Sequence, residues 1–399
     1  MKFKYKALSQ NGQTIEGTFD ATSEGEVISM IKGNNHMPME IERDIGADAK
    51  VEIFSKKVKK KDLAVFCRQF FTMINAGLGI VKCLDILVMQ TENKTLQKTL
   101  AAVSEDVQKG FTLSEALNKH TDIFPSILIS MVEAGEVSGS LDTILARMAE
   151  HFEKENKIEN KVKSSMIYPA ALAVVSVVVV VFMLVFVMPT FIGMFEGSGT
   201  ALPAPTRILI GISDSIRNFW YIYIAVIAAI VVGLATFKKS PEGTRFFDSL
   251  KLKFPIVKGT TKKIITSRFT RTLSTLMSSG IPLLKAMEIV SKVVNNVIIK
   301  ERLEEGTENI RKGNTLSRAV KDVGIFPPMV DSMIKIGEES GSLDDILFKT
   351  ADFYDEEVEA SLQRLTSLLE PVMLVGMALI IGFIVIAMYM PMFDMFNTI

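Results

Sequence analysis

Three segments of the chain are apolar and contain no charged residue. They lie within 164–195, at 219–237 and at 371–393, and the centre of the first consists almost entirely of Val, Ala, Leu, Phe and Met. At ~1.5 Å per residue, about twenty such residues cross the ~30 Å hydrocarbon core of a bilayer. The pattern therefore predicts three transmembrane helices, at 169–192, 219–237 and 371–393.

Outside these spans the apolar residues recur at helical spacing. Leu63, Phe66 and Phe70 fall on one face of a helix, and Gly77 just beyond it is expected as a left-handed C-terminal cap. Similar patterns fill the two long segments that precede the first and third spans. They predict two helical bundles of about six short helices each.

The first residues follow a different period. Residues 3–7 alternate between apolar and polar, Asn11-Gly12 marks a turn, and alternation resumes over 14–18, which predicts a β-hairpin. A short helix is expected at Glu24–Lys32. The basic run 56–61 has two open interpretations, a solvated linker or a contact for anionic lipid headgroups.

The two predicted bundles are copies of one unit. Twelve-residue segments beginning at Met131 and Met333 share eight identical residues, and the match enters the membrane, where Pro169 corresponds to Pro371. The longer matching segments are 66–87 with 269–290 at an offset of 203, and 131–142 with 333–344 at an offset of 202. The repeat is parallel, because the middle span returns the chain to the same side.

Each copy contains the sequence Gly-Glu-x-Ser-Gly-Ser-Leu-Asp. Ser140 and Ser342 within it are predicted as N-caps, followed by acidic residues that suit the positive end of a helix dipole. The helix that starts there is expected to run on toward the membrane, with Pro169 or Pro371 at the boundary. A force on either bundle could then reach its span through a stiff connection.

Lysine and arginine flank the spans unevenly. They are dense before the first span and after the second, whereas the intervening loop holds only Arg207 and Arg217 and the C-terminal tail holds none. The positive-inside rule therefore predicts cytoplasmic bundles, a cytoplasmic N-terminus without a cleavable signal peptide, and an extracytoplasmic C-terminus. The predicted order is an α+β module (1–55), a basic linker (56–61), a cytoplasmic bundle (62–168), a transmembrane helix (169–192), an extracytoplasmic loop (193–218), a transmembrane helix (219–237), a cytoplasmic bundle (238–370), a transmembrane helix (371–393) and an extracytoplasmic tail (394–399). The fold class is a mostly α, multi-pass membrane protein.

Composition and motifs exclude several function classes. The 45 basic residues equal the 45 acidic ones, which argues against a nucleic-acid partner. No Gly-rich P-loop is present, the three histidines lack ligand or triad spacing, and Cys67 and Cys83 are expected to be packed thiols. We therefore predict no catalytic activity, no cofactor and no metal site. The spans hold no Asp, Glu, Lys, Arg or His, which weakens a proton-relay or ion-path role.

The chain resembles the GspF/PilC family of inner-membrane platform proteins from type II secretion and type IV pilus systems. The resemblance covers essentially the whole length. It is carried by the Phe-x-Tyr-x-Ala pattern at Phe3, Tyr5 and Ala7, the block from Arg68 to Leu87, the two Gly-Glu-x-Ser-Gly-Ser-Leu-Asp turns, and the Glu-Pro pair at Glu370 and Pro371.

The resemblance implies a non-enzymatic adaptor in the plasma (inner) membrane. Its bundles would contact a hexameric cytoplasmic assembly ATPase, its spans would receive pilin or pseudopilin subunits from the bilayer, and it would associate with other inner-membrane components of the machine. It also implies a homo-oligomer, a dimer or larger. The first copy departs from the second at the membrane edge, where Tyr168 stands in place of Glu370.

Candidate partner-binding residues lie at the repeated turns and at the edge of the third span. Glu136 and Glu338 are expected as docking residues, because neither backbone geometry nor capping demands their charge. Gly135, Gly139, Gly337 and Gly341 are either docking surface or glycines kept for folding alone. Glu370 is either an interfacial charge at the start of a span or a contact for the charged N-terminal region of a pilin.

Other functions stay open at this point. A multi-pass transporter or channel is the alternative, favoured by several spans and a repeat, and an enzyme with an unrecognised site is the third possibility. Within the adaptor interpretation, a pilus, a secretion pseudopilus and a DNA-uptake filament are equally compatible with the motifs. The sequence also leaves open the subunit number, which bundle contacts the ATPase, and whether a retraction ATPase binds.

Overall fold

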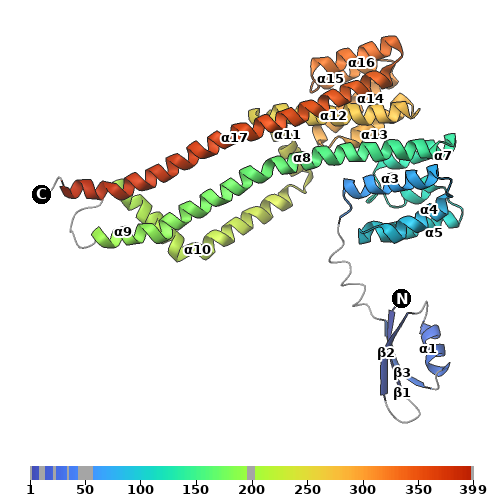
Figure 1. The fold of residues 1–399 in the computed structure, drawn as a ribbon, viewed down its shortest axis with the longest axis horizontal. Coiled ribbons are helices and arrows are strands. Elements are labelled where there is room, and N and C mark those ends of the chain that lie inside the picture. The colour runs from blue at the N-terminus through green and yellow to red at the C-terminus, as the bar shows by residue number, and fades with distance from the viewer. Residues whose placement is uncertain are drawn as a thin grey trace.

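The structure is a computed structural model that describes residues 2–8, 14–20, 24–33, 36–43, 57–195 and 203–396. Most of these residues are helical, as predicted (Figure 1). Three helices are long and apolar enough to cross a membrane, which agrees with the three predicted spans. The predicted turn at Asn11-Gly12 and the end of the C-terminal tail lie outside the described residues.

The N-terminal module is a three-stranded antiparallel sheet with one helix. Its strands β1 (Lys2–Leu8), β2 (Thr14–Asp20) and β3 (Met37–Arg43) lie in the order β2-β1-β3, and the helix is α1 (Glu24–Gly33). Ala7 of β1 is buried against Val27 and Ile31 of α1. The predicted strands and helix are therefore present, and β3 is an additional strand.

The two repeated segments fold into the same succession of helices. In the first copy they are α3 (Lys60–Asn75), α4 (Ile80–Gln90), α5 (Lys94–Gln108), α6 (Leu113–Asn118), α7 (Ser126–Ser138) and α8 (Leu141–Phe182). In the second they are α12 (Pro255–Ser278), α13 (Leu283–Val293), α14 (Val297–Arg311), α15 (Leu316–Val323), α16 (Pro328–Ser340) and α17 (Leu343–Phe396), preceded by α11 (Pro241–Lys253). The linker expected at 56–61 ends inside α3, because Lys60 and Lys61 are already helical.

Local sequence explains where these helices begin and end. The Thr112 hydroxyl accepts from the backbone N–H of Glu115, and the Glu115 carboxylate accepts from the backbone N–H of Thr112, so a capping box starts α6. At the equivalent helix α15, the Thr315 side chain accepts from Arg318 N, and no reciprocal bond completes a capping box. Gly77 follows α3 with φ of 84°, a left-handed conformation that glycine adopts without a Cβ clash.

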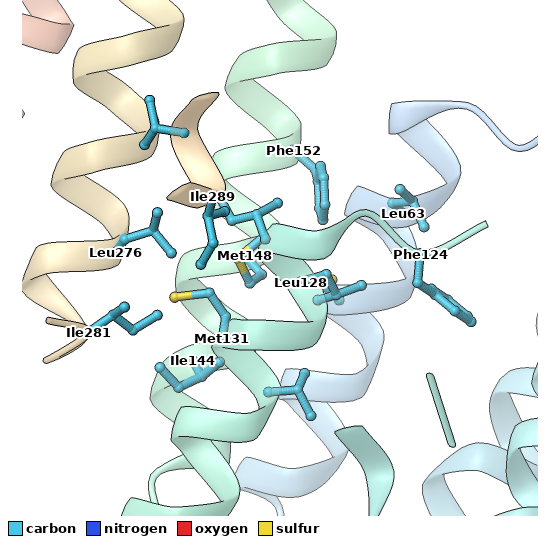
Figure 2. Close-up of a cluster of buried hydrophobic side chains, with 14 of the residues drawn as sticks. Leu63, Phe124, Leu128, Met131, Ile144, Met148, Phe152, Leu276, Ile281 and Ile289 are labelled. Atoms are coloured by element: carbon cyan, nitrogen blue, oxygen red, sulfur yellow. The ribbon is translucent and has the colours of Figure 1, made fainter. Parts of the chain in front are cut away.

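The two bundles share one hydrophobic core. Figure 2 shows Met131 of α7 and Ile144 and Met148 of α8 beside Leu276 of α12 and Ile289 of α13, all of them buried. Cys67 and Cys83 lie in the same core as free thiols, as expected. Burial raises the pKa of Cys67, which keeps this thiol protonated and unreactive.

The membrane region is more helical than the sequence indicated. Helix α8 continues through a π-helical turn, η1 (Met183–Val187), into α9 (Met188–Phe195), and α10 spans Ala204–Phe237. Residues 204–218, expected within a loop, therefore belong to a helix that bends at Phe219, where φ is −118°. The segment was missed because its apolar run is interrupted by Arg207, Asp214 and Arg217.

Hydroxyl groups join these helices where backbone carbonyls are free. The Ser213 hydroxyl of α10 donates to the Leu184 carbonyl within the π-helical turn at 2.5 Å, and Thr206 of α10 donates to Ala387 of α17 at 2.5 Å. A π-helical turn displaces the regular i→i−4 bonds, so the bond from Ser213 compensates it. Around these contacts Leu184, Met188, Leu209, Ile384, Ala387 and Met388 form a separate apolar cluster.

Helices α8 and α17 each run without a break from a bundle into a span (Figure 1). Pro169 and Pro371 lie inside them, where proline removes one backbone hydrogen bond. In α8 this frees the carbonyl of Ser165, and the Thr366 hydroxyl of α17 lies 3.4 Å from it, in addition to bonding its own Leu362 carbonyl at 3.0 Å. The two helices are thus bonded to each other where the first one is weakened.

Candidate partner-binding sites

The glycines of the repeated turns are fixed by geometry. Gly139 and Gly341 end α7 and α16 in the left-handed region, with φ of 69° and 70°. Gly135 and Gly337 are buried, and a Cβ on either would lie 2.9 Å from the next helix, at Ile144 Cγ1 and Leu343 Cα respectively. All four candidates therefore have a structural reason to be glycine, and they set the shape of the turns that connect to α8 and α17.

Glu136 and Glu338 are not free of a structural role, which corrects the premise on which they were singled out. The Glu136 carboxylate accepts from Leu113 N at 2.6 Å, Ser114 N at 3.1 Å and the Ser114 hydroxyl at 2.5 Å. Glu338 accepts from Leu316 N, Ser317 N and the Ser317 hydroxyl at 2.6, 3.2 and 2.5 Å. Each carboxylate thus neutralises the start of the short helix α6 or α15, which a helix dipole favours.

The predicted serine caps behave differently from the expectation. Ser140 occupies the N-cap position of α8, but its side chain makes no cap hydrogen bond. Its hydroxyl lies 2.6 Å from that of Ser138, and Ser342 pairs with Ser340 in the same way at 2.7 Å. Hydroxyl pairing across the left-handed glycine therefore closes each turn instead of a standard cap.

The turns lie at the end of the molecule opposite the spans (Figure 1). Beside Glu136, the side chain of Val137 is 87% exposed. The corresponding residue of the second copy is Glu339, also exposed, at 3.8 Å from Lys335. An exposed valine with no packing role is a feature that the sequence pattern did not single out, and only its exposure makes it a contact candidate.

Glu370 contacts the residue that replaces it in the other copy. The Tyr168 hydroxyl donates to Glu370 Oε1 at 3.2 Å, and both side chains are largely exposed at the edge of the spans. Farther from the membrane, ion pairs continue along the same two helices. Lys161 lies 2.5 Å from Glu359, and Lys154 lies 3.5 Å from Asp352.

A buried ionic cluster joins the two bundles and was not foreseen. Glu155 of α8 is paired with Lys60 of α3 and lies 3.7 Å from Arg268 of α12. Burial opposes the charge of Glu155, but His151, Lys60 and Arg268 outweigh it and lower the pKa of this carboxyl. Burial lowers the pKa of His151, so the neutral imidazole is favoured, and its Nδ1 has no hydrogen-bond partner among the described residues.

Equivalent ion pairs recur in each copy. The second copy pairs Lys263 with Glu357 at 2.6 Å, at the positions of Lys60 and Glu155. Likewise, Arg68 contacts Glu153 at 2.8 Å, and Arg271 contacts Asp355 at 2.6 Å. These ion pairs could not be predicted from the sequence, because the two partners of each pair lie more than eighty residues apart.

A 330 Å³ cavity lies between the copies beside the ionic cluster, lined by residues that include Arg147, His151, Arg271, Asp344 and Phe348.

Comparison with known proteins identifies the repeated unit. Residues 66–189 and 269–391 both match the family described as "Type II secretion system (T2SS), protein F", and residues 1–42 match its N-terminal domain. The two matches coincide with the internal repeat and include the first and third spans. The middle span lies between them.

The relatives carry two kinds of name. A type IV pilus assembly protein PilC of Myxococcus xanthus is 34% identical over 100% of this chain and 96% of its own length, and one of Thermus thermophilus is 35% identical over 100% and 98%. A type II secretion system protein F of Vibrio cholerae is 33% identical over 99% of this chain and 98% of its own length. The similarity therefore extends over whole chains in both groups.

Proposed function

Because this chain belongs to the GspF/PilC family of type II secretion system protein F and type IV pilus assembly proteins, we propose that it is the inner-membrane platform on which a pilus or pseudopilus is assembled. In this role it couples a cytoplasmic hexameric ATPase to the extraction of pilin subunits from the bilayer. The observation that carries the proposal is the continuity of α8 and α17, each of which is one helix from a bundle to a span.

The proposal includes an orientation of the chain in the membrane. The bundles lie in the cytoplasm and the C-terminus outside, because Lys154, Lys157, Lys161 and Lys163 precede the first span and Lys238 and Lys239 follow the second. A cysteine introduced at Asp394 should react with a membrane-impermeant maleimide in intact spheroplasts, whereas one at Glu242 should react only after permeabilisation. The opposite labelling pattern would refute this orientation.

The ATPase would contact the two turns at the membrane-distal end. Val137, Ser138, Glu339 and Ser340 are exposed there and supply the direct contacts, while the glycines and Glu136 and Glu338 hold the turns in shape. A motor that moves this end would move a rigid helix and, through it, the span. Glu370 at the membrane edge would meet the charged N-terminal region of an incoming pilin.

The test uses the full-length protein in nanodiscs with the assembly ATPase of the same host. We expect binding and an increased rate of ATP hydrolysis, both reduced about ten-fold by Val137→Glu, since a charge in an apolar contact costs one or more kcal/mol. Val137→Thr, which keeps the size, is the matched control. If folded wild-type protein neither binds nor stimulates the ATPase, the coupling role is wrong.

A further inference from the structure

Helix α11 begins after a short turn at the end of the second span and is bonded to that end. The Ser240 hydroxyl donates to the Phe237 carbonyl at 2.8 Å and accepts from Gly243 N at 3.1 Å. The Thr244 hydroxyl donates to the Lys238 carbonyl at 3.0 Å. A Cβ at Gly243 would lie 1.8 Å from the Phe237 carbonyl oxygen, so a larger residue could not approach the span this closely. The start of α11 is therefore held where the chain leaves the membrane.

The inward side of α11 is fixed to the second bundle. Asp248 is buried, and its Oδ2 accepts from the backbone N–H of Val297, the first residue of α14, at 3.1 Å. The Asn296 side chain donates to the Asp248 carbonyl at 3.4 Å, and α11 also packs on α12. These contacts, together with the bonded turn before the helix, determine which side of α11 faces outward.

The outward side of α11 is apolar and exposed. Phe246 and Leu250 lie one helical turn apart and are 58% and 46% exposed. Phe254 at the end of the helix and Ile256 at the start of α12 are also exposed, and we call these four residues the α11 patch. The ring of Phe246 is 6.4 Å from that of Phe237, the last residue of α10. The patch therefore continues the exposed apolar surface of the second span.

Basic side chains flank the α11 patch along the chain. Four exposed lysines have no ion-pair partner among the described residues: Lys238, Lys239, Lys253 and Lys258. Between the first and the last of them, the acidic residues are Glu242 and the buried Asp248, so the exposed charge is positive. A lysine stem can follow an apolar surface while its ammonium group stays in water. An apolar patch flanked by lysines therefore suits the boundary between acyl chains and headgroups.

We propose that α11 and the start of α12 form a binding surface for anionic phospholipids, in which the α11 patch enters the acyl-chain boundary and the lysines contact headgroup phosphates. The bonds to Phe237 and Lys238 keep the patch beside the span, so the bilayer is the surface next to it. The lysines favour anionic over neutral headgroups. This inference goes beyond the platform role and involves neither an ATPase nor a pilin.

Among the described residues, only the second copy has such a helix. Residues 57–59, before α3 of the first copy, are not helical, whereas α11 precedes α12 of the second. Because α11 is bonded to both the second span and α14, bound lipid holds the second bundle close to the bilayer surface. The first bundle is held there through α8 and the shared core.

Quenching by spin-labelled lipid locates the α11 patch in the full-length protein. Leu250→Cys is labelled with the polarity-sensitive fluorophore NBD, and the protein is placed in nanodiscs of phosphatidylcholine and phosphatidylglycerol. The nanodiscs also contain a phospholipid with a doxyl group near the headgroup end of its acyl chain. We expect blue-shifted emission and strong quenching. Ile336→Cys, a similarly exposed apolar position on α16, is the matched control and should show neither.

The labelling has its own control and clear contrary outcomes. The buried Cys67 and Cys83 should not take up label, which the unmodified protein verifies. Emission typical of water without quenching would overturn the proposal. So would a blue shift without quenching, because protein rather than lipid would then cover the patch. Equal quenching at Leu250 and Ile336 would also contradict it.

Electron paramagnetic resonance tests the preference for anionic headgroups. It measures the association constant of spin-labelled phosphatidylglycerol relative to spin-labelled phosphatidylcholine for the full-length protein in a phosphatidylcholine bilayer. Lys253→Gln with Lys258→Gln should lower this ratio about two- to five-fold, and high salt should lower it in the unmodified protein. Lys312→Gln with Lys335→Gln, two exposed lysines near the membrane-distal turn of the second copy, is the matched control and should leave the ratio unchanged.

All four lysines are exposed, so both double variants are expected to fold, and their melting temperatures verify this. An unchanged ratio in the folded variant of Lys253 and Lys258 would show that this surface does not select anionic lipid. An equal decrease in the control would show the same, and in either case the proposal would be wrong.

Discussion

The Tyr168 hydroxyl donates a hydrogen bond to Glu370 Oε1 at 3.2 Å, although the two residues occupy the same position in the two copies of the repeat. The contact lies at the edge of the first and third spans, at a position where the two copies differ in charge. Both side chains are exposed, so the bond itself contributes little to stability.

This arrangement separates two roles of Glu370. Tyr168→Phe removes only the hydrogen bond, and we expect it to leave fibre assembly and the free energy of unfolding nearly unchanged. Glu370→Gln keeps a hydrogen-bond acceptor but removes the charge, so it should impair assembly if the carboxylate meets a pilin. Counting surface fibres in cells that carry each variant decides the point. Normal assembly in Glu370→Lys would remove the pilin contact.

Removal of Glu136 should destabilise the first bundle. Glu136→Ala takes away three hydrogen bonds from the start of α6, and we expect a loss of about 1–3 kcal/mol in the free energy of unfolding. Glu338→Ala should cost a similar amount in the second bundle. Chemical denaturation in detergent measures both, with the exposed Glu339→Ala as the control. Unchanged stability together with lost ATPase binding would instead assign Glu136 to docking.

The equivalent pairs Lys60–Glu155 and Lys263–Glu357 should differ in their contribution to the free energy of unfolding. Glu155 is 7% exposed and lies near a second cation, whereas Glu357 is 32% exposed. Glu155→Gln should therefore lower the free energy of unfolding by about 2–3 kcal/mol, because it leaves partly buried cations unpaired. Glu357→Gln should cost less than about 1 kcal/mol. Equal losses would mean that burial does not distinguish the pairs.

Stability should fall as the pH drops below the usual range of histidine. Burial lowers the pKa of His151 against the opposing effect of Glu155 and Asp355, so the unfolded chain takes up a proton at higher pH than the folded one does. The melting temperature should therefore decrease between pH 7.5 and 5.5. Glu155, whose folded pKa is lowered, adds its own loss only at more acidic pH, below its unfolded value.

A substitution at His151 isolates its contribution to the pH dependence of the melting temperature. His151→Phe introduces the residue that the second copy has at this position, and it should flatten the melting temperature over the same pH interval. His120→Phe, at the turn after α6 and outside the ionic cluster, serves as the control and should keep the slope of the unmodified protein. If the slope persists in His151→Phe, another group is responsible for it.

The features that were predictable from the sequence depend on residues close together in the chain. The spans follow from long uncharged runs, the capping box from Thr112 and Glu115, and the left-handed cap from Gly77. The capping role of Glu136 was missed because its partner helix begins 23 residues earlier, and the cluster around Glu155 joins three helices from both copies. Strand β3 was overlooked although Met37, Met39 and Ile41 alternate, because Pro38 is unfavourable within a strand.

The unbroken course of α17 has a mechanical consequence. At ~1.5 Å per residue its 54 residues extend about 80 Å, so a tilt of about 5° around its midpoint displaces each end by about 3.5 Å in opposite directions. An ion pair at Glu359 and hydrogen bonds at Thr366 and Glu370 connect α17 to α8 near that midpoint. They can serve as the pivot. A movement no larger than a side chain at the turn before Leu343 would then reappear, reversed, at the far side of the membrane.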